Sequence, residues 1–179
     1  MAVNNNSINL QYRLGKLFGL VLGAFFLMQV ASGQAAETLD QNNKAYFSQL
    51  RIYNADLAEE NWTLNCRGCH KLGAVGLGKE MPNMNGQVAK FLAVEGGVEY
   101  LSRVPGIANS PLNNEELADL MNWMLLKYDA AHIPKDFTGF TAEKIESLRK
   151  NPLNMQAKVV RAKLIAEILM AEKVNEAQE

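Results

Sequence analysis

Residues 61–70 of the chain read NWTLNCRGCH, and this stretch decides how the rest of the sequence is interpreted. It holds both cysteines of the protein, Cys66 and Cys69, and one of its two histidines, His70, in the pattern C-x-x-C-H. The other histidine is His132. With so few cysteine and histidine side chains, the chain forms neither a disulfide-rich scaffold nor a zinc finger with two cysteine pairs.

The composition is that of a folded chain of ordinary domain size. The sequence has 179 residues, of which 48% are hydrophobic and 21% charged, values that argue against wholesale disorder. Its 18 basic and 19 acidic residues give a formal net charge of −1. A chain this close to neutral is not built around a phosphate-neutralising surface, so we expect no nucleic-acid partner.

The C-x-x-C-H pattern is typical of covalent haem attachment. Thiols of Cys66 and Cys69 on one turn can add to the two vinyl groups of a haem, and His70 is then aimed at the iron from the same face. We therefore predict one covalent haem c with His70 as the proximal axial ligand. A redox dithiol, a structural disulfide and a zinc site are the alternatives, and each accounts for less of the pattern.

The N-terminal residues have the pattern of an export signal. Arg13 and Lys16 precede an apolar run at residues 17–30, and small residues follow it. The run is shorter than the roughly 20 residues that span a bilayer. We expect a signal peptide over residues 1–35 and a periplasmic protein, or a membrane-anchored one if the signal is not cleaved. Export agrees with the haem motif, because haem of this kind is attached outside the cytoplasm in bacteria.

The remaining sequence shows helical periodicity and no strand pattern, so we predict an all-α fold. Residues 71–86, which hold several glycines, are expected to form a loop. The clearest helix covers residues 115–128, because Asn113 or Asn114 can cap it and two acidic residues follow. Further helices are expected over residues 40–62, 98–104, 141–150 and 153–173.

Three groups of side chains in these helices carry expectations of their own. Leu50, Tyr53 and Leu57 are spaced to share one face of the helix at 40–62. The charged run at 141–150 is expected to face solvent. Aromatic side chains are expected in the core around the porphyrin, namely Trp62, Phe91, Tyr100 and Trp123.

Over about residues 45–128 the chain resembles the class I c-type cytochromes. The resemblance rests on the helix that runs into C-x-x-C-H, on the glycine-punctuated loop KLGAVGLG after His70, and on the turn MPNMNG at residues 81–86. It implies a small helical domain around a covalent haem, in which the Pro82 carbonyl accepts a hydrogen bond from the ring of His70. Residues 113–128 are similar to the family's closing helix, which packs across the first helix.

The resemblance also defines the expected domains and function. The haem domain is expected at 36–130, followed by a helical C-terminal extension of two helices at 131–179. The family carries single electrons and is not enzymatic, so the implied partner is another redox protein, such as a periplasmic dehydrogenase, an oxidase or a peroxidase. The helix at 153–173 either packs on the haem domain or docks such a partner or a membrane complex.

Two other functions remain as alternatives. A haem whose sixth position is open would bind a diatomic ligand or peroxide, with Arg103 and His132 as the candidate helper groups. Alternatively, the chain is a fixed haem subunit of a larger respiratory or dehydrogenase complex, attached through its C-terminal helices.

The sequence departs from the family at the second axial ligand. The loop at residues 104–114, VPGIANSPLNN, holds no methionine and no histidine, although the family usually places its ligand methionine there. Met84, which lies 14 residues beyond His70 in a turn, is the first candidate. Weaker candidates are Met124, Met121, Met81 and His132.

Overall fold

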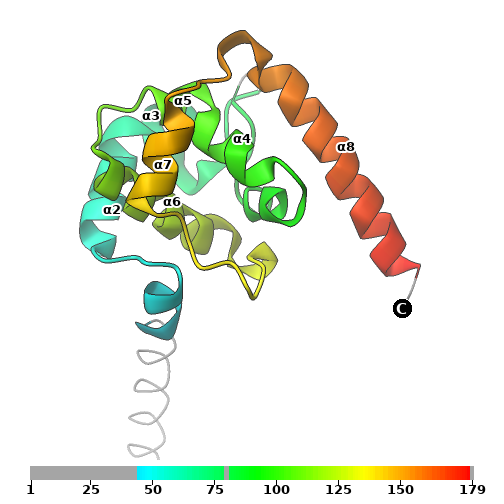
Figure 1. Ribbon diagram of the computed structural model, residues 1–179, viewed down its shortest axis with the longest axis horizontal. Coiled ribbons are helices and arrows are strands. Elements are labelled where there is room, and N and C mark those ends of the chain that lie inside the picture. The colour runs from blue at the N-terminus through cyan, green and yellow to red at the C-terminus, as the bar shows by residue number, and fades with distance from the viewer. Residues whose placement is uncertain (1–43, 79–80, 178–179) are drawn as a thin grey trace, which may run out of the picture. The chain divides into compact units, whose positions relative to one another are not determined.

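The computed structural model of the protein describes residues 44–78 and 81–177. The predicted signal peptide lies outside these residues. From Tyr46 onward the chain forms one compact unit of helices and loops (Figure 1). In the described ranges the only β-structure is a single antiparallel bridge between Leu77 and Met81, so the all-α prediction is confirmed. No helix within these ranges is both long enough and apolar enough to cross a membrane. The domain boundary near residue 130 stays a prediction.

The single helix predicted over residues 40–62 is interrupted, so that prediction is wrong. Residues 44–49 are helical, and a second helix, α2, spans Ala55–Asn65. Between them, Arg51 has a φ of 57°, which lies in the left-handed region and cannot continue a right-handed helix.

A tertiary contact holds this interruption in place. The buried carboxylate of Asp119 accepts hydrogen bonds from the backbone N–H groups of Tyr53, at 2.6 Å, and Asn54, at 2.9 Å. The side chain of Asn54 then accepts the N–H of Leu57 and caps α2. Tyr53, which was expected to share a helical face with Leu50, is therefore 83% exposed, whereas Leu50 is fully buried.

Several short helices and two long ones, α6 and α8, follow α2. They are α3 at Arg67–His70, η1 at Leu72–Ala74, η2 at Ala89–Ala93, α4 at Gly97–Arg103 and α5 at Pro105–Ala108. The chain continues through α6 at Asn114–Asp129, η3 at Ala130–His132, α7 at Ala142–Arg149, η4 at Asn154–Gln156 and α8 at Ala157–Glu176. The helices expected at 98–104, 115–128, 141–150 and 153–173 are thus confirmed to within a few residues, and Pro105 begins α5 because proline fits the first helical turn.

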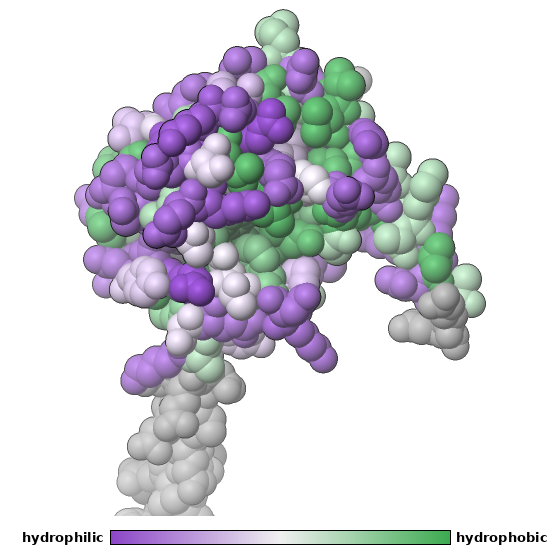
Figure 2. All heavy atoms as spheres, viewed as in Figure 1, coloured by the Kyte–Doolittle hydropathy of each residue, from purple (hydrophilic) through white to green (hydrophobic). Residues whose placement is uncertain are grey.

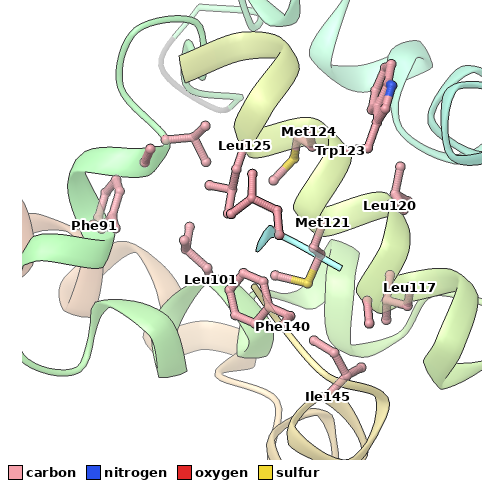
Figure 3. Packing of buried hydrophobic residues seen from close by; sticks show 14 of the residues in the cluster. Phe91, Leu101, Leu117, Leu120, Met121, Trp123, Met124, Leu125, Phe140 and Ile145 are labelled. Atoms are coloured by element: carbon pink, nitrogen blue, oxygen red, sulfur yellow. The ribbon is translucent and has the colours of Figure 1, made fainter. Parts of the chain in front are cut away.

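The central helix, α6, is fixed by its cap and by its burial. Asn113 and Glu116 form a capping box, in which each side chain accepts the backbone N–H of the other residue. All residues from 117 to 125 are buried, and Figure 3 shows α6 side chains packed among Leu101, Phe140 and Ile145. This helix therefore lies in the core, where α2 and α7 pack against it.

Two sets of contacts join the flanking helices to the rest of the unit. The first is between aromatic rings, since the ring of Trp62 on α2 lies 4.9 Å from the ring of Tyr128 on α6. The second is the C-terminal extension, because α7 packs on α6 and α8 packs on α4 and η2. Leu164 and Ile168 are the buried residues of α8. The predicted closing helix is therefore present, and the helix at 153–173 returns to the rest of the unit.

Candidate haem site

A cavity of about 440 Å³ lies between the C-x-x-C-H segment, the loop before η2, helices α4 to α6 and the start of α8. Cofactor pockets usually have volumes of about 300–1,000 Å³. Both cysteines and His70 line this cavity. The structure therefore gathers the three residues of the motif onto the wall of a half-open cavity of suitable size.

The two thiols lie on one turn because α2 ends where α3 begins. The carbonyl of Cys66 accepts the N–H of Cys69, at 3.2 Å, and of His70, at 3.0 Å, and this closes the turn. Both cysteines are free, with Cys66 half-buried and Cys69 exposed. Burial raises the pKa of the Cys66 thiol to about 11, and the nearby Cys69 adds to this rise. Reactive dithiols need a lowered thiol pKa, so this environment does not favour dithiol redox chemistry.

His70 occupies the environment of a neutral ligand. Its ring lies 5.9 Å from the ring of Trp62, and burial lowers the pKa of the imidazole from its usual range. The Pro82 carbonyl beside the ring opposes this shift, which is the neighbour that the family resemblance implies. Nδ1 of His70 is nonetheless buried without an acceptor at hydrogen-bond geometry. Burial thus favours the neutral imidazole, which is the form of histidine that binds a metal.

The loop carrying Pro82 is held against the residues that follow His70. The N–H of Leu77 donates to the carbonyl of Met81 at 2.8 Å, and the N–H of Met84 donates to the carbonyl of Ala74 at 2.9 Å. Gly76 permits this approach, because a Cβ atom there would lie 2.2 Å from the Met81 oxygen. The Pro82 loop, which lines the cavity, is therefore held in place by the segment that follows His70.

The structure separates the five candidates for the second axial ligand into two groups. The four methionines, Met81, Met84, Met121 and Met124, all line the cavity. His132 does not line it, and its ring binds the carboxylate of Asp129 with 42% of the side chain exposed. The second ligand therefore stays a prediction, with methionine as the residue type that the cavity supplies.

The wall formed by α4 and α5 is mainly apolar. Its cavity-lining residues are Tyr100, Leu101, Val104, Pro105, Gly106 and Ile107. Arg103 points elsewhere, since its Nε donates to the carbonyl of Asn151 at 2.6 Å. Neither Arg103 nor His132, the two helper groups considered for peroxide chemistry, thus belongs to the cavity lining.

The sequence analysis missed the contribution of the C-terminal extension. Asn154, Ala157, Lys158 and Arg161 line the cavity, although they lie beyond the family resemblance. The sequence held one indication that α8 reaches the cavity: Arg161, Leu164 and Ile168 are three and four residues apart and so share one helical face. An arginine on a buried face needs an anionic or carbonyl partner.

Arg149 was predicted to face solvent with the run at 141–150, and this was wrong. The side chain is half-buried and donates to the carbonyls of Ala108, Ser110 and Leu112. It also donates to the side chain of Asn114 at 3.2 Å. Arg149 therefore holds the segment between α5 and α6, which is the loop that departs from the family.

A metal ion held by protein groups alone has no support in the described ranges. No three His, Cys, Asp or Glu side chains there are grouped so as to hold an ion. The alternative of a zinc site is therefore not favoured. The fold and the site together fit an all-α protein that holds a haem.

Comparison with known proteins agrees with this class. The chain is 33% identical over 109 residues to a cytochrome c-552 of Thermus thermophilus, with 51% of this chain and 83% of the relative covered. A second cytochrome c-552 of the same species is also 33% identical over 109 residues and is covered to 74%. The chain belongs to the class I c-type cytochrome family. No family model and no solved structure matches it.

Proposed function

We propose that the protein is a periplasmic mono-haem cytochrome that passes single electrons between redox proteins. The observation that carries the proposal is the cavity that holds Cys66, Cys69 and His70 on its wall, in a chain whose relatives are cytochromes c-552. When bound, the haem supplies an iron that exchanges one electron between its ferric and ferrous forms.

Different residues of the chain would attach, coordinate and shield the haem. Cys66 and Cys69 would attach it through thioether bonds, and His70 would bind the iron as a neutral imidazole. The Pro82 carbonyl would orient the ring of His70 by accepting its free N–H. The apolar residues of α4, α5 and α6 would exclude water, which favours electron exchange with little rearrangement of solvent.

An exposed apolar surface around α3 favours a mobile carrier with a weak docking site. Leu64, Leu72, Val75 and Leu77 are exposed by 72%, 80%, 57% and 57%, and they flank the motif in sequence. Cys69 is also exposed, so the haem edge bound there would reach the surface. Transient redox complexes use small interfaces of this kind.

A second exposed apolar surface favours the alternative of a fixed subunit. Along α8, apolar side chains remain at the surface (Figure 2). They are Val159, Leu169, Met170 and Val174, which are exposed by 72%, 51%, 68% and 56%. If this face attaches the chain to a complex, the protein will be recovered from native membranes as part of a large assembly.

The two functions are separated by one pair of variants. Val75→Lys places a charge on the α3 surface, and Val159→Lys places the same charge on α8, both at exposed positions. For a mobile carrier, Val75→Lys slows oxidation of the reduced protein by washed native membranes several-fold, while oxidation by ferricyanide is unchanged. Val159→Lys leaves both rates unchanged. Slowing by Val159→Lys alone would instead support a fixed subunit.

The haem alternative with an open sixth position is tested by the visible spectrum with and without carbon monoxide. Two protein ligands to the iron predict a low-spin spectrum that carbon monoxide does not change. A spectrum that shifts on addition of the gas would contradict the carrier and support a ligand-binding protein.

A further inference from the structure

The start of α8 is held firmly beside the cavity. The N–H of Leu153 donates to the carbonyl of Arg103 at 2.8 Å, and Arg103 in turn donates to the carbonyl of Asn151. Further along α8, Glu172 forms an ion pair of 2.7 Å with Lys90, which lies in η2. These contacts at both ends of α8 fix which of its side chains face the cavity.

Arg161 is a cavity-lining residue of α8 whose charge has no carboxylate partner in the described part of the chain. It lies on the same helical face as Leu164 and Ile168, which are 4% and 8% exposed. In the described part of the chain, no carboxylate lies within ion-pair distance of Arg161. Its charge acts on Tyr100, another lining residue, and partly offsets the rise in the Tyr100 pKa that burial causes.

The haem expected in this cavity carries two carboxylate side chains, either of which could pair with Arg161. Its vinyl groups lie at one edge of the porphyrin and its two carboxylate side chains at the opposite edge. Of the thiols that would bind the vinyl edge, Cys66 lies between α2 and α3 and Cys69 lies in α3. In Figure 1, α3 and α8 lie to either side of α4. A carboxylate in a half-enclosed site is stabilised most effectively by an arginine, whose planar group can donate two parallel hydrogen bonds.

We propose that Arg161 binds a carboxylate side chain of the haem, so that the C-terminal extension is a haem-binding element. This inference rests on the proposed function, because it needs the haem. It extends the binding site into residues 131–179, which lie beyond the part of the chain that resembles the family. Lys158 lines the same end of the cavity and is a second cation there, but it also interacts with another protein group.

The test compares the purified haem proteins carrying Arg161→Gln, Arg161→Lys and Lys163→Gln. Lys163 is the matched control, because it lies two residues away on α8 with its side chain 79% exposed. A cation beside the haem disfavours the ferric form, which carries one more positive charge. Arg161→Gln is therefore expected to lower the reduction potential, whereas Arg161→Lys keeps it near that of the wild type and Lys163→Gln leaves it unchanged.

A second measurement reports the contact itself. Resonance Raman bands of the haem carboxylate groups depend on the hydrogen bonds that these groups accept. They are expected to shift in Arg161→Gln, and to a smaller extent in Arg161→Lys, because lysine cannot form the bidentate pair. If Arg161→Gln does not fold, the shift in Arg161→Lys still tests the contact.

Unchanged bands in both Arg161 variants would overturn the inference, as would a potential that falls equally in Lys163→Gln. Either result leaves the proposed function intact, provided that the wild-type protein holds its haem. A wild-type protein without haem would instead overturn the proposed function.

Discussion

At the scale of single residues, Gly76 determines whether Pro82 lies beside His70. Gly76 has a φ of 79°, and the space for a Cβ atom is filled by the Met81 carbonyl. Gly78 also has a positive φ, of 57°, but a Cβ atom there meets nothing within 4 Å. The two glycines therefore differ in packing while they share the backbone requirement.

This difference gives a matched pair of variants. Gly78→Ala is expected to cost about 1 kcal/mol of unfolding free energy from backbone strain alone. Gly76→Ala is expected to cost clearly more, and to change the visible spectrum of the haem protein, because the Pro82 loop must move away. Denaturant titration and the spectrum measure both effects. Equal losses in the two variants, with unchanged spectra, would show that the close approach at Gly76 is not needed.

Asp119 is the second residue whose effect is specific. Its carboxylate accepts two backbone hydrogen bonds from residues 53 and 54, and its removal leaves both donors without their partner. We expect Asp119→Ala to lower the unfolding free energy by about 2 kcal/mol or more. Asp136→Asn, at an exposed position, serves as the control and is expected to change it by less than about 0.5 kcal/mol. A loss below about 1 kcal/mol for Asp119→Ala would contradict the role assigned to this contact.

At the scale of elements, α6 and α7 were predicted well because capping residues at their starts reinforce the hydrophobic pattern. α6 begins at the Asn113 cap, and α7 begins after Thr141, whose hydroxyl accepts the N–H of Lys144. These signals lie within a few residues of the helix that they start. The break before α2 was missed because its cause, Asp119, is 65 residues away from Asn54 in the chain. Hydrophobic spacing does not contain that information.

The loop between α5 and α6 depends on another element, α7. Arg149 makes four hydrogen bonds to residues 108–114, and each bond to a charged donor contributes about 1.5–3 kcal/mol. Because these bonds share one side chain, we expect a loss of about 3 kcal/mol for Arg149→Met. Lys150→Met, at the adjacent exposed position, is expected to lie within about 0.5 kcal/mol of the wild type. Thermal or denaturant unfolding of the two variants checks this, and similar stabilities would contradict it.

At the scale of the whole molecule, the candidate site was predictable where its residues are adjacent in sequence and not where they come together by folding. Cys66, Cys69 and His70 lie within one turn, so their pattern alone predicted the haem. The cavity also includes Arg161 from α8, which no local motif marks. Four methionines at the cavity explain why no single second ligand could be chosen from the sequence, since each has a plausible route to the same space.

The same scale determines how the two interpretations of the C-terminal extension can be tested. Its inner face packs against α4 and η2 and reaches the cavity, so a truncation before α7 removes part of the site as well as any docking surface. Point variants on the outer face of α8 separate these effects, whereas truncation does not.

The measurement that tests the central claim most directly is the mass of the mature protein after export through a bacterial system that attaches haem c. The wild-type chain is expected to carry the mass of one haem through denaturation in acid and organic solvent, because thioether bonds to Cys66 and Cys69 survive this treatment. A chain in which both cysteines are replaced by serine is expected to lose it. A wild-type chain that leaves the same treatment at the mass of the polypeptide alone, with its thiols free, would contradict covalent haem attachment and with it the proposed electron carrier.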